Sequence, residues 1–111
     1  MSTPTAQQRS RVVFASSLAI DVATMALVPA ADSIAAETAV VFDRITAQLS
    51  AQGLGLADVV RITAYLRDES YLAEFETALH GRLAGDVPLS VAVLGLAGNC
   101  RVQVEAVALR S

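Results

Sequence analysis

The spacing of apolar residues changes period several times along this chain, and that change restricts the possible folds more than any other feature. Apolar residues recur at every second position in 58–67 and 101–109, which is typical of β-strands, and 11–19 is interpreted as a strand that is buried on both faces. Between these stretches they recur at helical spacing. The two expected inner helix faces are Ile34, Val41, Ile45 and Leu49, and then Leu72, Phe75, Leu79 and Leu83.

Capping residues predict where both helices begin and end. The pair Asp32-Ser33, shortly after a proline, predicts the start of the first helix, and Gly53 predicts its end. Ser70 is expected to cap the second helix, and Gly85 is expected to close it.

The order of the elements predicts the fold class. With an extended or turn segment at 21–28 and a strand at 88–94, the order is strand, strand, helix, strand, helix, strand, strand. This order predicts an α+β domain in which a single mixed sheet carries two helices on one face. Nothing in the chain is left to cover the other face, which is rich in Val and Ala. We therefore expect the sheets of separate subunits to pack against one another.

The composition also indicates an oligomer. Hydrophobic residues make up 54% of the chain and charged residues only 17%, whereas charged residues make up about a quarter of an average soluble domain. A surplus of apolar surface on so small a domain marks an interface between subunits.

What the sequence lacks argues against several classes of function. One His and one Cys cannot assemble a metal cluster, so no metal is expected. The glycine run at 53–58 follows a helix and enters a strand, the reverse of the order that aims a helix at a dinucleotide, so no dinucleotide-binding loop is expected there. Eight Arg residues, spread singly against eleven acidic residues, form no basic patch for nucleic acid.

The first thirty residues suggest two interpretations. Residues 1–10 are predicted to form a polar arm, followed by one domain over 11–111. The apolar stretch 12–31 could pass for a signal peptide, but Asp21 lies in its middle, where a carboxylate is costly in lipid. Two strands joined by a turn are favoured, and we expect a soluble, cytoplasmic protein with no membrane partner.

Glu105 is the strongest candidate for a functional residue. It lies in a strand otherwise made of Val and Ala, where a carboxylate must be paired, hydrogen-bonded or protonated. Arg61, on the polar side of another strand, is the candidate partner. Two interpretations stay open: a structural ion pair, or a carboxylate that activates water or holds a substrate amine. Cys100 is interpreted as a passive apolar side chain, and His80 as a surface residue.

Three stretches of the chain share a pattern with one known family. They are 53–68 (GLGLADVVRITAYLRD), 13–17 (VFASS) and 102–108 (VQVEAVA). In order and spacing they resemble the central signature, the Val-Phe-Val-Ser-Gly strand and the closing Val-Glu-Ile-Glu-Ala-Ile-Ala strand of the Rid family. Members of this family are reactive intermediate deaminases, also called YjgF-like proteins. The resemblance runs from about residue 11 to residue 109.

This resemblance implies a YjgF/chorismate-mutase-like fold and a homotrimer whose sheets form a barrel, with a small-molecule cleft at each subunit interface. It also implies hydrolysis of reactive enamines and imines to keto compounds and ammonia, without a cofactor. By position, it assigns Ser16 and Ser90 to the substrate-binding residues and Glu105 to the glutamate that positions water. Arg61 is added as a further candidate for substrate binding.

The chain departs from the family where the substrate carboxylate is bound. Deaminating members carry Pro-Ala-Arg-Ser before the penultimate strand, and this Arg binds the carboxylate with two hydrogen bonds. Residues 87–90 (VPLS) are one residue shorter here and contain no Arg. The Tyr-Ser segment and the Gly-Gln pair of the family cleft are also missing.

These departures leave three functions open. The first is a trimeric small-molecule-binding or regulatory module without turnover. The alternative is an enamine or imine deaminase that acts on an altered substrate. The third is the ribonuclease or translation-inhibitor activity that is historically attached to the family.

Overall fold

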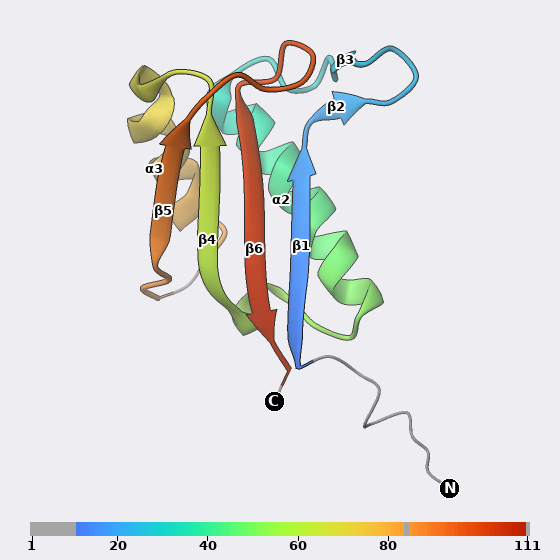
Figure 1. Cartoon of the computed structure of the whole chain (residues 1–111), viewed down its shortest axis with the longest axis vertical. Helices are drawn as coiled ribbons and strands as arrows, with labels where there is room; N and C mark the ends of the chain where they lie inside the picture. Colours follow the sequence, from blue (N-terminus) through green and yellow to red (C-terminus); the bar gives the residue numbers. More distant parts are fainter. Residues whose placement is uncertain (1–10, 84, 111) are drawn as a thin grey trace, which may run out of the picture.

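One four-stranded sheet forms the centre of the molecule (Figure 1). The computed structural model describes residues 11–83 and 85–110, so the predicted arm at 1–10 lies outside the described residues. The sheet order is β1-β6-β4-β5. Its strands are β1 (Val12–Leu18), β4 (Val59–Leu66), β5 (Leu89–Val93) and β6 (Val102–Leu109). A short hairpin, β2 (Ile20–Asp21) with β3 (Ala26–Leu27), occupies the expected turn segment at 21–28.

Both helices lie on the same face of this sheet. They are α2 (Ile34–Ala51) and α3 (Leu72–His80), and Figure 1 shows both behind the strands with the opposite face of the sheet open. The strands β4 and β5 are parallel and are joined through α3, while β6 is antiparallel to both of its neighbours. The sheet is therefore mixed, and the predicted α+β class is confirmed. No helix in the described part of the chain has the length and apolarity needed to cross a membrane.

The first helix follows its prediction closely. Ser33 caps it, because its hydroxyl accepts a 3.0 Å hydrogen bond from the Ala36 N–H. Gly53 adopts a φ of +76° just after the helix, a left-handed conformation that glycine adopts without strain. All four predicted inner residues are buried.

The second helix differs from its prediction at both ends. Its entrance is a 3-10 turn, Glu69–Tyr71, and the cap is the Asp68 carboxylate, which accepts a 2.9 Å hydrogen bond from the Ser70 N–H. The predicted cap, Ser70, is thus a donor to the true cap, and its hydrogen bonds lower the pKa of Asp68. The helix ends at His80, so Gly85 lies beyond it in the loop toward β5.

An irregularity in β4 corrects the predicted alternation of its side chains. Val59 pairs with Ala108 and Arg61 pairs with Val107, so Val60 is an extra residue with no partner of its own. As a result Val59 is buried at 5% exposure, whereas Val60, which period two groups with the buried Ile62, is 42% exposed. From Ile62 onward the strand alternates as predicted.

β1 was expected to be buried on both faces, and this expectation is wrong for the single chain. Ala15 and Ser17 face the helices and are buried, but Phe14, on the open face, is 76% exposed. The reason is that no element of the described chain packs on the open face.

β1 is also an edge of the sheet, and side chains of α2 bind its outer backbone groups. The Gln48 amide accepts from the Ser16 N–H at 3.1 Å and donates to the Ser16 carbonyl at 2.8 Å. Arg44 donates to the Leu18 carbonyl at 2.7 Å and to the Ile20 carbonyl at 2.8 Å. These bonds attach the strand to the helix that covers it.

Candidate functional site

The strand register brings the predicted site residues together on the open face. Ser16 of β1 lies directly opposite Glu105 of β6, and Glu105 lies opposite Thr63 of β4. Thr63 in turn lies opposite Ser90 of β5. Directly paired residues project from the same face of a sheet, so these four side chains form one row across all four strands.

A depression of about 310 Å³ surrounds the middle of this row. Arg61 joins Ser16, Thr63 and Glu105 in its wall. The remaining lining residues, Phe14, Ala15, Ala106 and Val107, are apolar. A small concave site with a few converging polar groups on an apolar surface is the usual form of a small-molecule site.

Glu105 does not form the predicted ion pair with Arg61. Its Oε1 accepts a 2.8 Å hydrogen bond from the Tyr65 hydroxyl, whereas Nη2 of Arg61 donates to Oγ of Ser90 at 3.1 Å. The register explains the outcome, because Glu105 lies opposite Thr63 and has Arg61 and Tyr65 as its two diagonal neighbours on β4. The tyrosine bonds to the carboxylate, and the arginine turns toward β5.

The bond to Glu105 keeps Tyr65 protonated to a higher pH than an ordinary tyrosine. The hydrogen bond itself, followed by burial and the nearby negative charge, raises the pKa of Tyr65 above its ordinary value. At neutral pH this phenol is therefore a fixed donor to Glu105. The bond uses Oε1 of Glu105, so Oε2 is available to a ligand.

The Arg61 guanidinium has no carboxylate partner within the described residues. The two ion pairs found there join Arg82 to Asp43 and Arg101 to Glu37. The depression thus offers a cation, Arg61 of β4, and an anion, Glu105 of the neighbouring β6, and no ion pair joins the two. Such an arrangement suits a ligand that itself carries both charges.

Other residues considered in the sequence lie away from the depression. Cys100 is buried, and burial raises the pKa of its thiol, so it is not a thiolate nucleophile. His80 is exposed at the end of α3, on the helix side of the sheet. Among the described residues there is no cluster of three or more side chains that could hold a metal ion.

Sequence reasoning missed Tyr65 and Thr63 as members of the site. The period-two pattern of β4 already places both on the same side as Arg61. The pattern could have indicated them as neighbours of a carboxylate on the adjacent strand. It could not indicate which of them Glu105 would contact.

Comparison with known proteins agrees with this fold. A family model described as endoribonuclease L-PSP matches residues 3–110. RidA from an Antarctic Psychrobacter species superposes with a TM-score of 0.79 at 24% identity, covering 93% of this chain and 84% of that one. Yeast Mmf1 superposes with a TM-score of 0.80 at 18% identity, covering 94% and 83%.

A further solved structure, from Mycobacterium tuberculosis, is a member of the YjgF/YER057c/UK114 family. It superposes with a TM-score of 0.73 at 25% identity, covering 93% of this chain and 82% of that one. The comparison with curated proteins gives no match.

Proposed function

The chain belongs to the endoribonuclease L-PSP family, also known as the Rid or YjgF/YER057c/UK114 family, and on this basis we propose that it binds a small zwitterionic molecule. The ligand would carry a carboxylate next to an amine or imine nitrogen. One observation carries this proposal: Arg61 and Glu105 share one depression without pairing with each other. The carboxylate would be bound by Arg61 and the nitrogen by Glu105, with the Ser16 hydroxyl beside them.

The binding unit in this proposal is a homotrimer, with the ligand held where subunits meet. Apolar side chains at one end of the open face support it: Val12, Phe14 and Leu109 share this face by register and are 36%, 76% and 45% exposed in the single chain. Exposed apolar residues of this size, gathered next to a polar depression, are typical of an interface. A second copy packed there would shield the depression from water and strengthen both charge interactions.

Hydrolysis of an imine is the second candidate, and the free side of the Glu105 carboxylate favours it. Water would lose a proton to Glu105 as its oxygen bonds to the imine carbon, while the imine nitrogen takes up a proton from solvent. The proton on Glu105 would then pass to the nitrogen, the C–N bond would break, and ammonia would leave. The remaining hydroxyl would lose its proton as the keto group forms.

Ribonuclease activity has less support in this site. A single basic side chain, that of Arg61, lines the depression. Binding of an RNA backbone depends on several phosphate contacts from cationic side chains, and on aromatic rings for stacking. We therefore rank it below both small-molecule functions.

Calorimetric titration with 2-aminobutyrate tests the proposal, with butyrate and butylamine as probes of one charge each. We expect the zwitterion to bind more tightly than either analogue. Arg61→Gln should remove the preference over butylamine, and Glu105→Gln the preference over butyrate. Glu69→Gln, an exposed change outside the depression, is the charge-matched control for the second variant. Equal affinities for all three probes would contradict the proposal.

A further inference from the structure

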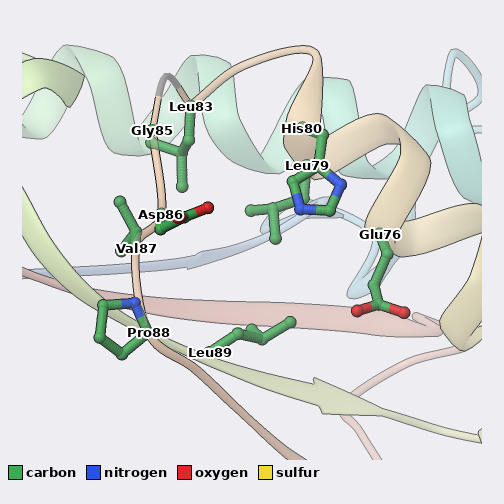
Figure 2. Close-up of a pocket in the computed structure, with 9 residues that line it drawn as sticks. All are labelled: Glu76, Leu79, His80, Leu83, Gly85, Asp86, Val87, Pro88 and Leu89. Carbon is green, nitrogen blue, oxygen red and sulfur yellow. The ribbon is translucent and has the colours of Figure 1, made fainter.

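A second cavity, of about 250 Å³, lies on the other side of the sheet between the end of α3 and the start of β5 (Figure 2). Its apolar floor consists of Leu79, Leu83, Val87 and Leu89. Leu79 and Leu83 are buried at 3% and 7% exposure, so this floor is continuous with the hydrophobic core.

Polar side chains stand only at the mouth of this cavity. Glu76 and His80 are one helical turn apart on α3, so both project from the same side of the helix. Asp86 comes from the loop before β5, and Figure 2 shows all three around the same opening. The cavity therefore has an apolar interior and a mouth with two carboxylates.

Neither carboxylate at the mouth is neutralised by the described part of the chain. Glu76 and Asp86 take part in no ion pair or hydrogen bond among the described residues. The nearest arginine in sequence, Arg82, is bound instead to Asp43 of α2 at 2.6 Å. No arginine lines the cavity.

We propose that this cavity binds a small organic cation, an ammonium group on a compact apolar body. The apolar body would displace water from the leucine floor, and the ammonium would lie between Glu76 and Asp86. A ring nitrogen of His80 can accept one of its hydrogen bonds. At about 30 Å³ per water-sized group, the volume holds about eight non-hydrogen atoms. An anion would meet two negative charges and no positive one.

This site is separate from the depression at Glu105. Leu89 pairs with the buried Ile62, so its side chain is on the helix side of the sheet, whereas Ser90 faces the opposite side with Thr63. The sheet lies between the two sites. Loss of one can therefore be measured without loss of the other.

Titration of the full-length protein with benzylammonium, followed by ¹⁵N NMR at low salt, tests the inference. Benzyl alcohol and benzoate are the neutral and anionic controls of similar size. We expect shifts centred on residues 76–89, affinity for benzylammonium about tenfold above that for benzyl alcohol, and no binding of benzoate.

Two double variants of equal net charge distinguish binding that depends on the cavity carboxylates from nonspecific binding. The double variant Glu76→Gln/Asp86→Asn should lower the affinity for benzylammonium about tenfold, because each exposed ion pair contributes about threefold. Asp32→Asn/Glu69→Gln changes the net charge equally outside the cavity and should leave the affinity unchanged. Equal binding of the three probes, equal effects of the two double variants, or shifts centred on Ser16 and Arg61 would each overturn the inference.

Discussion

The Tyr65 hydroxyl donates a 2.8 Å hydrogen bond to Oε1 of Glu105, from one strand to the diagonal position on the next. Glu105 makes this contact in place of the expected ion pair with Arg61. It holds the carboxylate in one orientation without cancelling its charge. The Arg61 guanidinium is then available for a ligand, with Ser90 holding one of its nitrogens.

The same hydrogen bond makes a prediction at alkaline pH. The folded protein holds the Tyr65 proton more tightly than the unfolded chain does, since the pKa is raised by Glu105. The resulting stability is complete below the ordinary tyrosine pKa of about 10 and is lost as pH rises through the higher folded value. Ultraviolet titration of the phenolates should show this, and Glu105→Gln should lower the pKa of Tyr65. An unchanged phenol titration in Glu105→Gln would contradict the contact.

Arg61 should carry the binding of carboxylate ligands. Arg61→Gln removes the charge-assisted hydrogen bonds, and we expect about a tenfold weaker affinity for 2-aminobutyrate, measured by calorimetry. Ser90→Ala should have a smaller effect, because it frees the guanidinium but leaves its charge. Arg82→Gln, on the helix side of the molecule, is the matched control and should bind normally. A normal affinity in Arg61→Gln would show that Arg61 does not bind the ligand carboxylate.

Turnover of 2-aminoacrylate, generated by a coupled serine dehydratase, should be weak. No arginine occurs at 87–90, and Leu89 there packs on the helix side of the sheet. Arg61 would bind the carboxylate in its place, but its Nη2 is already bonded to Ser90, and the loss of the family's bidentate geometry is expected to cost several orders of magnitude in rate. Glu105→Gln should reduce ammonia release to the spontaneous rate that is measured without the protein. Binding of 2-aminobutyrate with no release above that spontaneous rate would support the module without turnover over the hydrolase.

Phe14 should be required for the assembly of subunits but not for the folding of the single chain. Its side chain is 76% exposed, so Phe14→Glu disturbs no core packing. Light scattering of the wild type should report about three times 11.6 kDa, and that of the variant about 11.6 kDa. Circular dichroism should show the same helix and strand content for both. A monomeric wild type would contradict both the trimer and a site shared between subunits.

Glu37 should be essential for stability, although it lies outside both sites. It is fully buried, and its carboxylate accepts hydrogen bonds from the Arg101 N–H and Nε, both at 2.7 Å, and from the Val102 N–H at 3.0 Å. Glu37→Gln leaves the Arg101 guanidinium without its charge partner. We expect a loss of about 3 kcal/mol in the free energy of unfolding, measured with urea. The exposed Glu69→Gln should change it by less than about 0.5 kcal/mol.

The fold was predictable because it depends on the period of apolar residues. Arg-Ile-Thr-Ala occurs twice, at 44–47 in α2 and at 61–64 in β4, and the flanking period separates the two environments correctly. The extra residue Val60 was not predictable, because a bulge is defined by the partner strand and not by the strand that contains it.

The candidate site was predictable as a set of residues but not as a set of contacts. Period two gives the face on which Glu105, Arg61 and Tyr65 lie, and the resemblance to a family adds Ser16 and Ser90. The choice of tyrosine over arginine depends on the relative register of β4 and β6, which no local pattern encodes. The cavity under α3 depends on where a loop closes over the core, and capping residues had placed the end of that helix too late.

The hydrogen bonds that α2 makes to the outer edge of β1 protect the chain against aggregation at high protein concentration. An uncovered edge strand can accept a strand from another chain, which is the first step toward fibrous aggregates. Here both backbone groups of Ser16 and the carbonyl of Leu18 are already bonded to Gln48 and Arg44. An incoming strand would have to displace both side chains before it gained a bond at these positions. The edge of the sheet next to the open apolar face is thus protected against the addition of a further strand.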